Sequence, residues 1–303
     1  MATASKKSAP GDPLQRLGPD LRRIVEASHH DPFAALGRHP DGDGERVRCF
    51  IPGAAEVTLA DTATPMERVL PEVDLFEARI GRGRLPAHHR LAWVDRHGRR
   101  HERHDPYTFP PQIGDLDLHL FGEGRHRHAY RFLGAHPRTV DGVEGTLFAT
   151  WAPNAARVSV VGDFNEWDGR AHPMRVRAGG GVWELFIPGV GPGALYKLEV
   201  RNHETGHLHL KTDPYGRRFQ HRPETASLVT APSAYAWGDG EWLSARAGVR
   251  WQQAPLSIYE VHLGSWQRDA EGEPLDYRTL AERLVAYVAE QGFTHIEIGR
   301  AHV

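Results

Sequence analysis

Two tryptophans and one lysine in the middle of the chain are the side chains best suited to hold a ligand. Trp167 ends a Gly-Asp-Phe-Asn-Glu-Trp run, Trp183 precedes Glu-Leu, and Lys197 follows Tyr196. An aromatic face can stack on the apolar face of a ligand ring, and a nearby cation or amide can hydrogen-bond the polar groups of the ligand. Lys197 lies opposite Tyr196 and Leu198 on its predicted strand, so we expect it to point to solvent. Tryptophans also fill protein cores, and this alternative stays open for both.

Eight histidines form close pairs that could suggest a metal site. They are His88 and His89, His101 and His104, His126 and His128, and His207 and His209. Zinc ligands must converge and need supporting groups behind them, whereas these pairs lie in arginine-rich polar stretches without a cysteine partner. We therefore expect a solvated surface and no metal site. The arginine runs at 96–103 and 125–131 are expected to be solvated as well.

The composition is that of a globular protein without a strong electric field. The chain has 303 residues, of which 25% are charged and 40% hydrophobic, which suffices for two domains and part of a third. Its formal net charge of −2 does not attract a polyanion, and acidic residues interleave with the arginines. We therefore expect no nucleic-acid partner.

Cysteine content and hydrophobic runs indicate the compartment. Cys49 is the only cysteine, so no disulfide can form within the chain, which suits a reducing environment. Residues 1–13 lack the apolar core of a secretory signal and are expected to be a flexible leader. No run approaches the roughly 18 apolar residues of a membrane span. The expectation is a cytoplasmic protein without a membrane partner.

The chain contains an internal repeat. A Leu-Gly-X-His-Pro run begins at Leu36 and again at Leu133, and each copy later contains Pro-X-Ala-Ala-X-Val and Asp-Pro-Tyr. The spacing between copies grows from 97 at these leucines to 101 at Pro52 and Pro153, and to 108 at the Asp-Pro-Tyr runs. Growing spacing is expected when insertions lengthen surface loops. Two copies of one module are therefore predicted.

Each copy has the pattern of short β-strands. In the second copy Leu147, Ala149 and Trp151 alternate with their neighbours, as do Val158 and Val160, and glycine- and proline-rich turns separate such runs. This pattern predicts two tandem immunoglobulin-like β-sandwiches in a mainly β protein. Before the first copy, apolar residues at helical spacing predict a helical segment within residues 14–36.

The pattern changes near the end of the chain. Residues 256–263 read as a strand, Asp276 is a suitable N-cap for a helix, and Gly292 is suited to end it. Residues 293–298 read as a second strand. A strand, a helix and a strand form a βαβ unit with parallel strands, which cannot be a domain alone.

The second copy resembles a family-48 carbohydrate-binding module, the sandwich that precedes the catalytic barrel of 1,4-α-glucan branching enzymes. The similar segments are residues 151–155, 162–167, 183–185 and 196–198. Residues 257–266 are similar to the first barrel strand of these enzymes, and residues 277–296 to the following helix and strand. The first copy resembles the additional N-terminal sandwich of the long bacterial members. The fold implied is two sandwiches followed by an incomplete (β/α)8 barrel.

The resemblance implies a retaining transglycosylase acting on α-1,4-glucan or glycogen. In such an enzyme one carboxylate attacks C1 and forms a covalent glycosyl-enzyme, while a second carboxyl serves as acid and then base. The 6-hydroxyl of another glucose accepts the chain, and no metal or organic cofactor is needed. The catalytic carboxylates follow later barrel strands, so none is assigned here, and Glu260 and Glu297 receive no such role. Residues that match Trp167 and Lys197 bind sugar in glycan-sensing relatives, so these two are the implied sugar contacts, and Trp183 is a further candidate because it is a second aromatic of the same module.

The resemblance and the patterns together predict the following organisation. We expect a leader at 1–13, a helix and first sandwich at 14–113, a connector at 114–130, a second sandwich at 131–232, a linker at 233–255 and a truncated barrel start at 256–303. The last six residues depart from the family pattern and match a translated sequencing adapter, so we expect the natural gene to be longer. Alternatives are a non-catalytic glycan-binding protein and a related family-13 debranching or trehalose-releasing hydrolase.

Overall fold

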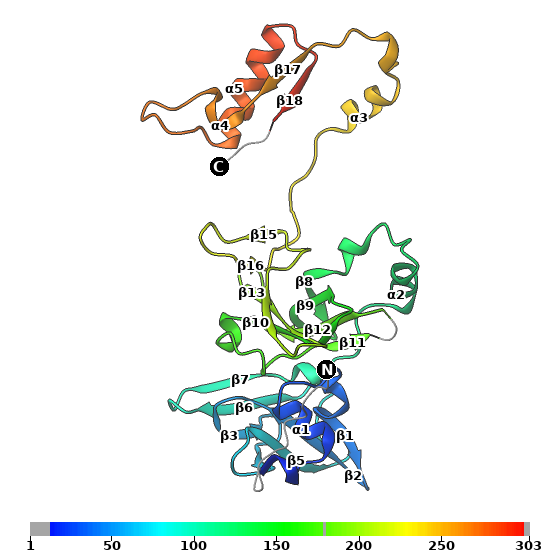
Figure 1. The fold of residues 1–303 in the computed structure, drawn as a ribbon, viewed down its shortest axis with the longest axis vertical. Coiled ribbons are helices and arrows are strands. Elements are labelled where there is room, and N and C mark those ends of the chain that lie inside the picture. The colour runs from blue at the N-terminus through cyan, green and yellow to red at the C-terminus, as the bar shows by residue number, and fades with distance from the viewer. Residues whose placement is uncertain (1–12, 178–179, 300–303) are drawn as a thin grey trace. The chain divides into compact units, whose positions relative to one another are not determined.

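The computed structural model describes residues 13–177 and 180–299 (Figure 1). The chain divides into two compact units, Met1–Ser233 and Ala234–Val303. The expected leader, apart from residue 13, and the last four residues lie outside the described part. Among the described residues, no helix is both long enough and apolar enough to cross a membrane. Strands dominate the first unit, so the prediction of a mainly β protein is confirmed.

Seven antiparallel strands form the first sheet. They are β1 (Gly37–Asp41), β2 (Gly44–Phe50), β3 (Ala54–Leu59), β4 (Thr64–Arg68), β5 (Leu75–Gly81), β6 (Arg90–Asp95) and β7 (Arg100–His104), in the order β1-β2-β5-β4-β3-β6-β7. Buried Val47 and Phe76 from one half of this order share a core with Val57 and Leu91 from the other. The sheet therefore folds over, with β4 as the shared strand, and its two halves face each other as layers.

The second set of strands forms two separate sheets. Its strands are β8 (Gly134–Val140), β9 (Val143–Trp151), β10 (Ala155–Gly162), β11 (Arg175–Arg177), β12 (Val182–Pro188), β13 (Leu195–Asn202), β14 (Leu208–Lys211), β15 (Arg218–Phe219) and β16 (Ser227–Leu228). One sheet has the order β11-β12-β9-β8, and the other has the order β10-β13-β16-β15 with β14 also paired to β13. Phe148 and Leu185 from one sheet pack with Val160 and Tyr196 from the other. This arrangement is a two-layer sandwich.

The internal repeat is confirmed as a duplicated strand order. The path β1-β2-β5-β4 corresponds to β8-β9-β12-β11, and β3-β6-β7 corresponds to β10-β13-β14. Details repeat as well: Nε2 of His39 lies 2.9 Å from the carbonyl oxygen of Leu36, and Nε2 of His136 lies 2.9 Å from that of Leu133. The two modules therefore share local contacts in addition to topology.

The N-terminal segment is less helical than its apolar spacing predicts. It consists of η1 (Pro13–Arg16), α1 (Pro19–Val25) and η2 (Pro32–Ala34). The α-helix begins with a proline, and Ala27 behind its end has a φ of 50°, in the left-handed region that ends a helix. Ile24 and Leu36 nevertheless enter the core that the two sandwiches share.

The segment that joins the two sandwiches, which includes the connector expected at 114–130, is a packed layer. The chain from the first sandwich to the second forms η3 (Pro106–Thr108), α2 (Asp115–Gly122) and η4 (Ala129–Arg131). Phe109, Ile113 and Phe132 from this segment pack on Leu147 and Phe186, which lie on the outer face of the β11-β12-β9-β8 sheet. That sheet is therefore buried on both faces, and every residue of β12 is buried.

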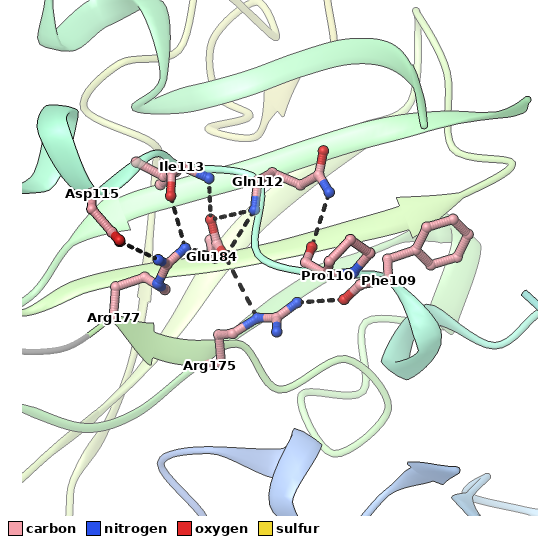
Figure 2. A network of polar contacts seen from close by, with 8 residues as sticks. All are labelled: Phe109, Pro110, Gln112, Ile113, Asp115, Arg175, Arg177 and Glu184. Carbon is pink, nitrogen blue, oxygen red and sulfur yellow. Dashed lines mark hydrogen bonds and ion pairs between the residues drawn. The ribbon is translucent and has the colours of Figure 1, made fainter. Parts of the chain in front are cut away.

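A buried carboxylate fastens this layer to the sheet, as Figure 2 shows. Glu184 on β12 is 1% exposed, and its carboxylate accepts hydrogen bonds from the backbone N–H of Gln112 and Ile113. Arg177 donates to the same carboxylate at 2.9 Å, and Nε of Arg175 lies 3.5 Å from it. The two arginines also donate to the carbonyl oxygens of Ile113 and Phe109, respectively. One charge thus joins β11, β12 and the segment between the modules.

The two sandwiches contact each other through β11. The guanidinium carbon of Arg175 lies 3.4 Å from the centroid of the Phe33 ring, and the backbone N–H of Val176 donates to the carbonyl of His30 at 3.0 Å. The hydroxyl of Tyr107 donates to the carbonyl of Pro173 at 3.3 Å. The N-terminal segment and the end of the first module are therefore both tied to the second.

The second unit contains a single βαβ element. Its elements are α3 (Gly240–Ala247), η6 (Trp251–Gln253), β17 (Ile258–Val261), α4 (Leu263–Trp266), α5 (Tyr277–Glu290) and β18 (His295–Ile298). β17 and β18 are parallel, as predicted. Asp276 accepts hydrogen bonds from the backbone N–H of Arg278 and Thr279, which confirms it as the N-cap, and Gly292 has a φ of 78°. Leu280, Leu284 and Val288 of α5 are buried.

Limited trypsin digestion should separate the two units. No residue from 231 to 258 is buried, and Arg246 and Arg250 are exposed within this stretch. A protease can therefore bind the backbone there without unfolding a hydrophobic core. We expect mass spectrometry to find a stable fragment ending at Arg246 or Arg250. Early cleavage at Arg125 or Arg127 with the stretch after 234 intact would contradict this expectation.

Removal of the Glu184 charge should destabilise the first unit. In Glu184→Gln, two guanidinium groups lose the anion that compensates them in a buried site, which costs about 3–5 kcal/mol of unfolding free energy. Urea denaturation followed by circular dichroism measures this loss. Glu204→Gln, at an exposed hairpin position, is the matched control and should change the unfolding free energy by less than about 0.5 kcal/mol.

Candidate functional site

The β10–β11 loop, residues 163–174, presents the first predicted ligand residue. It begins with η5 (Asp163–Asn165), and the Asn165 side chain anchors it by accepting from the N–H of Gly162 and donating to the carbonyl of Val160, both at 2.9 Å. Glu166 and Trp167 then adopt φ values of 54° and 60°. Two consecutive non-glycine residues in the left-handed region form a sharp turn, and such turns occur where the surrounding structure holds them.

Trp167 is half-buried at this turn. Its indole Nε1 donates to Asp163 Oδ1 at 2.9 Å, and its backbone N–H donates to the carbonyl of Gly162 at 3.0 Å. Both ends of the residue are therefore fixed, while part of the ring stays in contact with solvent. A fixed, partly exposed indole is suited to stack on a sugar ring because little side-chain entropy is lost on binding.

Lys197 lies on β13 next to the strand that leads into this loop. It pairs in register with Val161, two residues before Asp163. Its neighbours Tyr196 and Leu198 are 1% and 2% exposed, so the prediction that Lys197 points away from the core is confirmed. Its ammonium donates to Thr225 Oγ1 at 2.7 Å, which leaves two donors for a ligand.

Trp183 lies in the sandwich core. Its side chain is 2% exposed, and its indole N–H donates to the carbonyl of Ala152 at 3.0 Å. Neither ring face is open to a sugar, which argues against the predicted contact. The reason is its strand position: Trp183 alternates with Leu185 and Ile187 on the face of β12 that packs against the other sheet.

The solvated surface predicted for the histidine pairs is wrong at three positions. His89 is 0% exposed, His88 stacks on Phe109 with the ring centroids 3.9 Å apart, and His126 is largely buried beside Asp117 at 2.8 Å. His207 and His209 are both exposed, as predicted. Across residues 13–177 and 180–299, no three His, Cys, Asp or Glu side chains gather as metal ligands.

Two family models match the two sandwiches. Residues 18–107 match the N-terminal domain of the alpha-1,4-glucan branching enzyme GlgB, and residues 132–216 match carbohydrate-binding module 48, described as the isoamylase N-terminal domain. Trp167 and Lys197 lie within the second match, as does the whole β10–β11 loop.

Similar whole sequences are 1,4-alpha-glucan branching enzymes named GlgB. The enzyme of Methylococcus capsulatus is 56% identical to this chain over 94% of this chain's length. The enzyme of Cellvibrio japonicus is 55% identical over 94% of this chain's length. The enzyme of Nitrosococcus oceani is 52% identical over 92%. The matched regions span 37–40% of these relatives. Over both matched segments, the chain is therefore similar in sequence to the 1,4-alpha-glucan branching enzymes.

Proposed function

We propose that this chain is the glucan-holding part of a 1,4-α-glucan branching enzyme of glycogen synthesis. The observation that carries the proposal is the fixed, half-exposed indole of Trp167 beside the strand of Lys197, within a carbohydrate-binding module. The ring supplies apolar surface for the sugar face, and the ammonium donates to its hydroxyls. An α-1,4-glucan held here would be attached to the same polypeptide that carries the proposed barrel. Trp183 has no part in this contact.

The proposal includes the finer architecture. The two sandwiches are taken as immunoglobulin-like modules at 14–113 and 131–232, and residues from 256 onward as the beginning of a (β/α)8 barrel. The parallel pairing of β17 and β18 around α5 supports a barrel, because parallel neighbours joined by a helix are its repeating unit. Ile258 and Ile298 are 47% and 58% exposed, as expected of strand residues that need further barrel strands to cover them.

The proposed reaction breaks an α-1,4 bond and forms an α-1,6 bond. In a retaining mechanism a carboxylate takes the glucan as a covalent ester, and a 6-hydroxyl then displaces it. We place these carboxylates on later barrel loops and assign none of the described residues to them. A cytoplasmic location is part of the proposal and is supported by Cys49, a free and buried thiol.

Branching activity distinguishes this proposal from a purely binding protein. The complete genomic open reading frame should yield a protein that lowers the absorbance of the amylose–iodine complex, because branching shortens the linear helices that bind iodine. The chain of 303 residues alone should leave that absorbance unchanged. A genomic stop codon directly after Val303 would remove the proposed catalysis and leave glucan binding as the function.

Loss of the Trp167 ring should weaken retention on glycogen. Removing the stacked apolar surface of an indole costs about 1.5–3 kcal/mol, which corresponds to an affinity at least about tenfold lower in Trp167→Ala. Affinity electrophoresis in glycogen-containing gels measures the change. Tyr130→Ala, which removes another exposed aromatic side chain of the same unit, should migrate as the wild type does.

Lys197 offers a second test of the same surface. Lys197→Ala should weaken retention, whereas Lys211→Ala on the neighbouring β14, an exposed lysine, should not. Equal effects of the two lysine substitutions would show that the electric charge of the module, and not a contact at Lys197, governs retention.

A further inference from the structure

A cleft of about 340 Å³ opens between the two sandwiches of the first unit. The β6–β7 hairpin contributes Trp93 and Arg103, and the β10–β11 loop contributes Phe164, Glu166 and Asp168. The volume lies within the range of about 300–1,000 Å³ in which small-molecule sites occur. Trp167 does not line the cleft although both its neighbours do. The cleft thus lies beside Trp167 without being lined by its ring, and Asp163, which accepts the indole N–H of Trp167, belongs to the lining.

Arg103 offers unused hydrogen-bond donors to this cleft. Its guanidinium carbon lies 4.9 Å from the centroid of the Trp93 ring, which also stacks on His101 at 5.0 Å. A guanidinium stacked on an aromatic ring uses its flat face and keeps its N–H edge available. Within the described parts of the chain, that edge makes no hydrogen bond or ion pair. Arg103 is partly buried, so the solvated surface expected for the run 96–103 is wrong at this residue. Burial lowers the pKa of Arg103, a sign that water compensates this charge poorly.

The acidic groups of the cleft already have partners. Glu166 forms an ion pair with Arg99 at 3.0 Å across the cleft, and Arg99 also pairs with Asp95 at 2.7 Å. Asp168 pairs with Arg170, and Asp163 accepts from Trp167. Compensated carboxylates bind a metal cation poorly, and their number disfavours an inorganic anion beside Arg103. A neutral ligand rich in hydroxyl groups meets neither obstacle, and its hydroxyls can accept hydrogen bonds from a guanidinium group.

We propose that this cleft is a second carbohydrate site, which holds a short α-1,4-glucan segment between the first sandwich and the β10–β11 loop. The glucan as ligand class rests on the proposed function. Arg103 donates to sugar hydroxyls, and Trp93 holds its guanidinium in place. The loop would then contact glucan from two sides, through Trp167 on one and through the residues beside it on the other.

Calorimetric titration of the whole chain with maltotetraose tests this proposal in a Trp167→Ala background. We expect Trp167→Ala to retain one binding site, and the added Arg103→Gln change to weaken that site at least about tenfold, as for the loss of hydrogen bonds from a charged donor. Arg100→Gln, an exposed arginine of the same strand, is the matched control and should leave the site intact. Unchanged affinity in the Arg103→Gln variant would overturn the proposal.

Blocking the cleft with a bulky label tests the same carbohydrate site without a substitution at Arg103. His97 is exposed at the cleft, and the natural Cys49 is buried, so His97→Cys can be labelled selectively with a bulky maleimide. The labelled Trp167→Ala protein should lose maltotetraose binding, and the unlabelled protein should keep it. Binding that persists after labelling, or displacement of the sugar by millimolar inorganic phosphate, would contradict a glucan site.

The two proposals fail in different ways. If the wild-type chain binds maltotetraose and Trp167→Ala alone abolishes all binding, the cleft site is wrong and the proposed function stands. If the wild-type chain binds no maltotetraose, the glucan-holding role itself is wrong, and the cleft site with it.

Discussion

The buried carboxylate of Glu184 is the interaction on which the first unit depends. A charge at 1% exposure is tolerated only when nearly all its lone pairs accept hydrogen bonds, and here two backbone N–H groups and two arginines surround it (Figure 2). The same arginines reach outward: Arg175 covers Phe33 of the N-terminal segment, and Arg177 bonds the chain before α2. The orientation of the two sandwiches, and hence the cleft between them, follows from this junction.

The two modules each have a glutamate at the same strand position, but its surroundings differ. Phe50 pairs with Leu75 in the first module as Trp151 pairs with Val182 in the second, so Glu77 and Glu184 occupy equivalent positions. Glu77 is 32% exposed and pairs with two arginines of β2 at the surface. Glu184 lies under the layer formed by the segment between the modules. The second copy thus has a buried anchor at the position where the first has a surface ion pair, and its arginine partners lie on β11, whereas those of Glu77 lie on β2.

The repeat also shows how far sequence alone can reach. The strand pattern, the βαβ unit and the direction of Lys197 follow from alternation and caps, which are local properties. The core position of Trp183 was predictable too, because Trp183 alternates with the apolar Leu185 and Ile187 along the chain. The burial of His88 and His89 was not, since it depends on Phe109 and Asp105 reaching them from elsewhere in the chain. Arginine-rich neighbours suggested solvent, and tertiary packing decided otherwise.

The largest difference in length between the two copies lies where both candidate sites meet. The spacing between copies is 101 residues at Pro52 and Pro153 and 107 at Glu77 and Glu184, so the additional residues fall between β10 and β12. The first module closes the same connection with the four residues between β3 and β4. The sandwich core fixes the strands on either side, and the loop itself ends in that core at Met174, which is 0% exposed. Its length lets one loop carry Trp167 and also reach the β6–β7 hairpin of the other module, which a short turn could not do.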